Sequence, residues 1–179
     1  MASLEKRDLF GGAITADAPP TLMDVSDIRQ VPDTQEVFVY PDSNVSIITE
    51  ILEKVDASKP EDIIKFHFDS LAHDNEARSS KMKEISTLAN EWGDRTPPPI
   101  LLKGEQFVQK FDKTTLDRVE ILMAVFRVEE KGIDLVVTFN VPLDAADGGA
   151  VGVSDLAKIE SDFEAFVKSL CIVDFGLFA

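Results

Sequence analysis

The fold is decided by a stretch that reads RVEILMAVFRV at Arg118–Val128, EEKG at Glu129–Gly132 and IDLVVTFNV at Ile133–Val141. Two long runs of mostly apolar residues, joined by a short polar segment that ends in glycine, are typical of a β-hairpin. We predict another strand upstream, at Ile100–Phe111, with a turn or bulge at Lys103–Gly104. Successive strands joined in this way favour an antiparallel sheet that is covered by helices.

Three helices are predicted around this hairpin, because apolar residues recur there at helical spacing. They cover about Val45–Asp56, Pro60–Ala72 and Ser154–Leu170. Shorter strands are predicted at Phe10–Thr15, Met23–Val25, Gln35–Tyr40, Lys81–Ala89 and Cys171–Val173. A chain of 179 residues has the size of one domain. We therefore predict a single α+β domain over residues 1–179, with helices packed on a largely antiparallel sheet.

The chain is strongly acidic, with 33 Asp and Glu residues, 18 Lys and Arg residues and a net charge of −15. Proteins that bind the nucleic-acid backbone instead carry clustered Lys and Arg, so we do not expect nucleic acid as a partner. Met1–Asp8 is charged where a signal peptide would be apolar, and no apolar stretch reaches the ~18 residues of a membrane span. We expect an intracellular protein that does not insert into membranes.

Few residues are suited to catalysis. The two histidines, His67 and His73, form no His-Glu-x-x-His zinc motif, and the sequence has no Gly-x-x-x-x-Gly-Lys-Ser/Thr phosphate-binding loop. We interpret His67 as a packed helix residue and Cys171, which lies between two apolar residues, as a small core residue. The sequence therefore predicts a protein without covalent catalytic chemistry, cofactor or metal site.

Acidic residues are concentrated in the first third of the chain. Ala16–Asp56 contains nine acidic and two basic residues, nearly half of the excess negative charge. On the predicted helix at Val45–Asp56, Glu50 and Glu53 are three positions apart and would project from the same side. These residues predict either a surface that binds a basic protein partner or an ordinary solvated face.

Six short segments, spread almost from end to end, carry a family resemblance. They are LFGGAI (Leu9–Ile14), DVSDIR (Asp24–Arg29), VPDTQEV (Val31–Val37), SIITEILE (Ser46–Glu53), TFNVPL (Thr138–Leu143) and VDFGLFA (Val173–Ala179). Together they resemble the Ran guanine-nucleotide release factors, the MOG family. The VPDTQEV string in this setting is the most specific of the six.

The resemblance implies an α/β/α sandwich, similar to the photosystem II extrinsic P protein, with a largely antiparallel central sheet of about six strands. It also implies that the chain binds the small GTPase Ran, promotes release of its guanine nucleotide and supports nuclear protein import, in the nucleus and cytoplasm. We expect a monomer without a cofactor. The family's binding determinants correspond here to six acidic residues: Asp24, Asp27, Asp33, Glu36, Glu50 and Glu53.

We hypothesise that Glu50 and Glu53 bind basic residues of Ran near its nucleotide site, and that the segment from Asp24 to Glu36 completes the contact. Asp33 and Glu36 have a structural alternative, because carboxylates beside a turn also accept hydrogen bonds from backbone N–H groups. The alternative function is an acidic adaptor that binds a basic protein without promoting nucleotide exchange.

Overall fold

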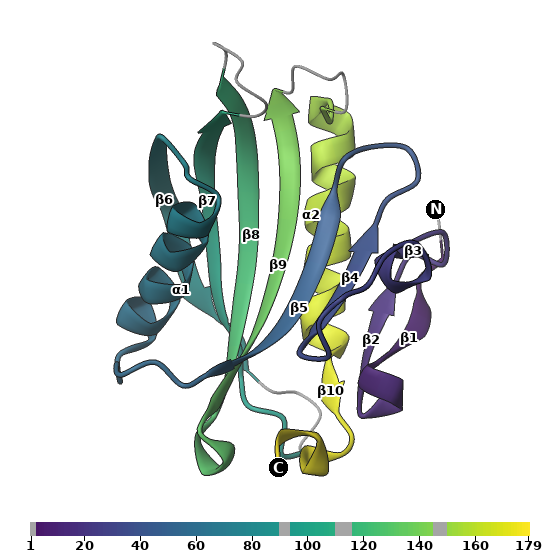
Figure 1. Cartoon of the computed structure of the whole chain (residues 1–179), viewed down its shortest axis with the longest axis vertical. Coiled ribbons are helices and arrows are strands. Elements are labelled where there is room, and N and C mark those ends of the chain that lie inside the picture. Colours follow the sequence, from purple (N-terminus) through teal and green to yellow (C-terminus); the bar gives the residue numbers. More distant parts are fainter. Residues whose placement is uncertain (1–2, 90–93, 110–115, 145–149) are drawn as a thin grey trace.

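The computed structural model describes residues 3–89, 94–109, 116–144 and 150–179, which form two antiparallel sheets and two long helices (Figure 1). The larger sheet has seven strands in the order β3-β4-β5-β9-β8-β7-β6, and the smaller has three in the order β1-β2-β10. Figure 1 shows α1 in front of the large sheet and α2 behind it. The fold is therefore an α/β/α sandwich, as predicted, with seven central strands instead of about six.

The elements have the following bounds. The strands are β1 (Glu5–Leu9), β2 (Ile14–Ala18), β3 (Met23–Asp24), β4 (Gln35–Val39), β5 (Ser46–Glu53), β6 (Ser79–Thr87), β7 (Ile100–Gln109), β8 (Leu116–Val128), β9 (Ile133–Asp144) and β10 (Cys171–Ile172). The α-helices are α1 (Pro60–Asp74) and α2 (Val153–Ser169), and the 3-10 turns are η1 (Phe10–Gly12), η2 (Val25–Asp27), η3 (Glu129–Lys131) and η4 (Phe175–Phe178).

The β8–β9 hairpin forms the centre of the large sheet, which confirms the prediction. Its last pair is Val128 opposite Ile133, and Gly132 closes the turn with φ +67, a left-handed conformation that glycine adopts without strain. Successive side chains of β8 point to opposite faces of the sheet, so they contribute to two hydrophobic cores. Leu122 and Phe126 pack in the cluster that contains α2 residues, whereas Met123 packs in the cluster that contains α1 residues.

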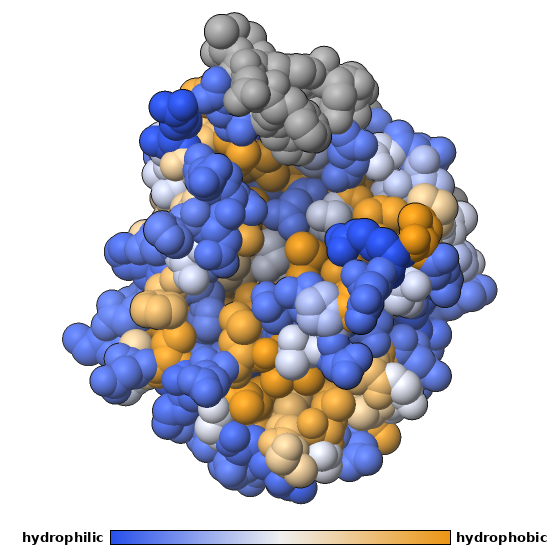
Figure 2. All heavy atoms as spheres, viewed as in Figure 1, coloured by the Kyte–Doolittle hydropathy of each residue, from blue (hydrophilic) through white to orange (hydrophobic). Residues whose placement is uncertain are grey.

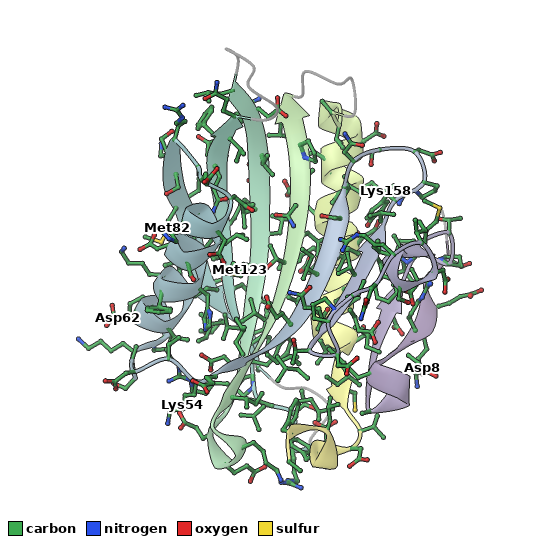
Figure 3. The ribbon with its side chains drawn as sticks, in the orientation of Figure 1. Asp8, Lys54, Asp62, Met82, Met123 and Lys158 are labelled. Carbon is green, nitrogen blue, oxygen red and sulfur yellow. The ribbon has the colours of Figure 1, made fainter. Side chains whose placement is uncertain are left out.

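The two cores define the two faces of the large sheet, named here the α1-side face and the α2-side face. On the α1-side face, Met123 is buried, and Met82 of β6 packs against the same cluster (Figure 3). Phe68 of α1 lies directly over Gly104 of β7, where an added Cβ would come within 2.9 Å of the ring. This glycine therefore permits close approach of helix and sheet.

The prediction of a helix at Val45–Asp56 is wrong, because Ser46–Glu53 form β5, an inner strand between β4 and β9. Its apolar residues serve both faces, since Ile47 belongs to the α2-side core and Leu52 packs against the α1-side core. A run that is apolar on both faces also satisfies a helical pattern. The abundance of β-branched residues in SIITEILE favours the strand.

Two smaller predictions also need correction. Phe10–Thr15 is not one strand: Phe10–Gly12 form the turn η1, which connects β1 to β2. The predicted interruption at Lys103–Gly104 is absent, because β7 is continuous there; the irregularity lies opposite, between Met82 and Glu84 of β6. The end of the predicted Ile100–Phe111 strand lies outside the described residues.

Candidate functional site

The α1-side face of the sheet is hollowed where α1 does not cover it. Figure 2 shows the hollow between α1 and the β3–β4 side, with apolar residues on its floor. Alternation along β5 places Ile48 and Glu50 on this face, and both are half-buried. On the neighbouring β9, Thr138 is buried and pairs with Ile48. Ile48, Glu50 and Thr138 therefore give this open sheet face both apolar and polar groups.

Glu50 and Glu53 lie on opposite faces of the sheet. Because β5 is a strand, residues three positions apart point in opposite directions. Glu50 faces the α1-side hollow, where it accepts a hydrogen bond from the Gln35 amide at 3.0 Å. Glu53 is exposed and pairs in register with Ile133, which packs on the α2-side core. The prediction that both carboxylates project from one side is therefore wrong.

Asp24 and Asp27 lie in the short segment that begins at the sheet edge. The Asp24 carboxylate accepts hydrogen bonds from the Ser26 backbone N–H at 2.9 Å and from the Ser26 hydroxyl at 2.7 Å, and so caps η2. Asp27 is exposed in the same turn, followed by Ile28, whose side chain is 70% exposed. Asp27 is thus the carboxylate of this pair that is presented to solvent beside an exposed apolar residue.

Glu36 is oriented towards the inside of the molecule. Its carboxylate accepts a hydrogen bond at 2.7 Å from the backbone N–H of Phe10, a residue with φ +52. Burial raises the pKa of Glu36, and the nearby carboxylate of Asp24 adds to the rise, although the Phe10 N–H and Arg7 oppose it. These contacts support the structural alternative for Glu36, which holds the η1 turn against β4.

Asp33 and Glu36 come together at a pocket of 380 Å³. Its described lining comes from four parts of the chain, including Leu177 of η4 and the turn that carries Val31 and Pro32. Asp33 is exposed at this opening. Gln35, which also lines the pocket, donates the hydrogen bond to Glu50. The structure therefore connects the Asp33–Glu36 segment to Glu50 through Gln35, but it does not bring all six predicted carboxylates onto one surface.

A buried polar cluster beneath α1 was not predicted from the sequence. Asp134 is fully buried, and its carboxylate is 2.8 Å from His67 Nε2 and accepts hydrogen bonds from Arg127 at 2.7 and 3.0 Å and from the Val55 N–H at 3.2 Å. Arg127 also donates to the carbonyl oxygens of Val55 and Ala57. The cluster fixes α1 and the β5–α1 connection to the β8–β9 hairpin, beside the hollow. A signal for it exists in the sequence, because Arg127 and Asp134 interrupt apolar strands at positions that face each other across the hairpin.

His67 and Cys171, the two residues weighed for catalysis from the sequence, each contact a carboxylate. No group of three or more His, Cys, Asp or Glu side chains among the described residues is arranged to hold a metal ion. His67 is buried against Asp134, and burial raises the pKa of the Cys171 thiol, which donates to Asp94 at 3.3 Å. A raised pKa disfavours the nucleophilic thiolate. Neither α1 nor α2 has the length and apolar composition needed to cross a membrane.

Comparison with known proteins identifies the family of this chain. The sequence model of the family described as "Ran-interacting Mog1 protein" matches residues 7–142. The chain belongs to the Mog1 family. It is 31% identical over 180 residues to a protein named Ran guanine nucleotide release factor of Danio rerio, covering 96% of this chain and 98% of that protein.

Other Mog1-family relatives are similar over nearly their whole lengths. The Ran guanine nucleotide release factor of Homo sapiens is 32% identical, covering 95% of this chain and 94% of the relative. The protein named nuclear import protein mog1 of Schizosaccharomyces pombe is 29% identical, covering 96% and 98%. The crystal structure of the Saccharomyces cerevisiae Ran-binding protein Mog1p superimposes with a TM-score of 0.79, at 28% identity and with complete coverage of both chains. This Mog1-family protein therefore shares its entire fold with a solved member.

Proposed function

We propose that this chain binds the small GTPase Ran and promotes release of its bound guanine nucleotide, thereby supporting nuclear protein import. The observation that carries the proposal is membership of the Ran-interacting Mog1 family across residues 7–142, together with relatives named Ran guanine nucleotide release factor that match over 94–98% of their lengths. The acidic composition supports a basic partner surface. The role is that of a regulator, acting as a monomer in the nucleus and cytoplasm.

The proposed mechanism is thermodynamic coupling between two ligands of Ran. A GTPase binds its nucleotide through a P-loop lysine and Mg²⁺, which neutralise the phosphates. A protein that binds the nucleotide-free form more tightly than the loaded form must, by reciprocity, weaken nucleotide binding. No side chain of this chain needs to enter a chemical reaction. Its task is to present carboxylates to basic groups that the departing phosphates leave without a counter-charge.

We assign that contact to three of the six acidic residues, which lie in the α1-side hollow and at its edge. Glu50 faces the hollow, and Asp27 and Asp33 are exposed on the adjoining segment. Asp24 and Glu36 are positioning residues, because each carboxylate accepts hydrogen bonds from backbone N–H groups of its own chain. The carboxylates of these two residues therefore hold the backbone of the neighbouring turns in position.

Glu53 is expected to contribute less to Ran binding than Glu50. Its exposed carboxylate lies on the α2-side face, so a partner seated in the hollow reaches it only by extending around the end of β5. We therefore assign the larger contribution to Glu50. Charge reversal distinguishes the two residues, because each change has the same effect on net charge.

The test is the dissociation of fluorescent GDP and GTP from purified Ran, with and without this chain. We expect the chain to accelerate dissociation, Glu50→Lys to reduce that acceleration by about tenfold, and Glu53→Lys to have a smaller effect. Glu61→Lys, an exposed change on α1, is the matched control with the same charge change. Binding to Ran without acceleration would replace the release function with the adaptor function, and absence of binding would refute both.

A further inference from the structure

A second cleft lies on the other side of the sheet from the hollow. It has a volume of 450 Å³ and is bounded by α2 on one side and by β6 and β7 on the other. Leu101 and Leu122 of the sheet and Phe163 of α2, all members of or packed against the α2-side core, form an apolar floor. Its size falls within the range of about 300–1,000 Å³ that is usual for ligand sites.

The rim of this α2–β6 cleft is negatively charged. Among its described residues are three carboxylates, Glu84, Glu160 and Glu164, and one basic residue, Lys103. Lys103 pairs with Glu160 at 3.0 Å, and Glu164 pairs with Lys168 at 2.9 Å. Within the described part of the chain, Glu84 has no ion-pair partner. An apolar floor with a net negative rim is complementary to an apolar group flanked by cations.

The strand beside the cleft favours a polypeptide as the occupant. β6 is the last strand of the seven-stranded sheet, so its outward backbone groups pair with no other strand among the described residues. All of its side chains are exposed except Met82, which is half-buried. An extended peptide that lies along such an edge gains backbone hydrogen bonds, while its side chains enter the neighbouring cleft.

We propose that the α2–β6 cleft is a docking site for a segment of a partner protein that carries one or two bulky apolar side chains flanked by Lys or Arg. The apolar side chains enter the floor at Leu101, Leu122 and Phe163, and a basic side chain reaches the carboxylate of Glu84. The carboxylates of Glu160 and Glu164 already have lysine partners. The site is independent of the surface proposed for Ran, because it lies on the α2-side face, away from Glu50. The protein would then hold two partners at once.

The test uses a fluorescein-labelled probe peptide, acetyl-Lys-Leu-Lys-Phe-Lys-Leu-Arg-amide, and the intact chain. Fluorescence anisotropy measures affinity, and two-dimensional ¹⁵N–¹H spectra locate the contact. Two variants alter the cleft: Ala157→Trp, at an exposed α2 position on its wall, fills it, and Glu84→Lys reverses the free charge of the rim. Glu61→Lys on α1 controls for general attraction to an acidic protein, and circular dichroism checks that each variant is folded.

We expect saturable binding, with spectral changes at Glu84–Leu88, Leu101–Lys103 and Ala157–Glu164. Both cleft variants should weaken binding by about tenfold or more, and the control should stay within about twofold. The proposal is overturned by the absence of saturable binding at millimolar peptide, or by spectral changes located elsewhere. It is equally overturned if Glu61→Lys weakens binding as much as Glu84→Lys, because the attraction would then be non-specific.

Discussion

The substitution Asp134→Asn tests whether the buried cluster beneath α1 is a main support of the fold. It keeps the shape of the side chain but removes its charge and places an amide NH₂ where hydrogen-bond donors already point. Arg127, which is 9% exposed, and His67, which is 4% exposed, then lose their carboxylate partner. Breaking a buried, hydrogen-bonded ion pair from one side leaves an uncompensated charge in the interior.

The magnitude follows from the pKa of Asp134. Hydrogen bonds from His67, Arg127 and the Val55 N–H outweigh the effect of burial and lower the pKa from 3.8 to about 2. That difference corresponds to about 2 kcal/mol of stability at neutral pH. Adding the cost of the unpaired donors, we expect Asp134→Asn to reduce the free energy of unfolding by about 3 kcal/mol at pH 7.

The pH dependence provides a second and independent readout. Because the folded-state pKa lies below the ordinary value, the stabilisation is complete above about pH 5 and is lost as the pH falls towards 2. Urea unfolding should therefore be measured for the parent protein and for Asp134→Asn between about pH 5 and pH 2.5. The difference between their free energies of unfolding should decrease by about 2 kcal/mol as the pH falls. Asp69→Asn, at an exposed pair with Lys65, is the control and should change stability by less than about 0.5 kcal/mol. A loss below about 1 kcal/mol, or a difference independent of pH, would refute this account of the cluster.

Two further substitutions test the packing around the two faces. Glu36→Gln keeps an oxygen that accepts the Phe10 N–H. Burial raises the pKa of Glu36, so its ionised carboxylate is less favourable in the folded protein than in the unfolded chain. We expect unchanged or slightly higher stability at pH 7 in thermal unfolding, with Ran affinity unchanged; weaker Ran binding by the folded variant would show instead that the carboxylate is a direct contact. Gly104→Ala would place a Cβ 2.7 Å from the Lys81 carbonyl oxygen and 2.9 Å from the Phe68 ring. Urea denaturation should show a loss of about 1–3 kcal/mol, and a stability equal to that of the parent would mean that helix and sheet separate at little cost.

Much of the architecture was predictable from local patterns. The hairpin at Arg118–Val141 specifies its own turn and register, and the antiparallel sheet follows from it. The helix predicted at Pro60–Ala72 is confirmed as α1, which begins at Pro60 and buries Ile63, Ile64 and Phe68. The strand predicted at Lys81–Ala89 is also confirmed in substance, as β6 at Ser79–Thr87.

The helix prediction at Val45–Asp56 failed for a physical reason, and the same error misplaced two predicted site residues. An inner strand with apolar residues on both faces lacks the two-residue period that identifies an edge or half-exposed strand. A helical reading of Ser46–Glu53 placed Glu50 and Glu53 together, whereas the strand separates them by the thickness of the sheet. Periodicity alone could not decide between the two.

The internal roles of the carboxylates also depend on distant contacts. The bond from the Phe10 N–H to Glu36 joins residues 26 positions apart, and the bond from Val55 to Asp134 joins residues 79 positions apart. Composition marks the acidic segment but cannot separate a carboxylate that orders the fold from one that is presented to a partner. The structure shows that Asp27 and Asp33 are exposed to solvent.

The affinity of this chain for Ran in its nucleotide-free, GDP-bound and GTP-bound forms is the measurement that most directly tests the central proposal. Calorimetric titration of the three forms would measure the preference on which nucleotide release depends. We predict binding to nucleotide-free Ran at least about tenfold tighter than to one or both loaded forms, because that ratio equals the factor by which nucleotide affinity falls. Equal affinity for all three forms would contradict the proposal, since a ligand without such a preference cannot shift nucleotide binding.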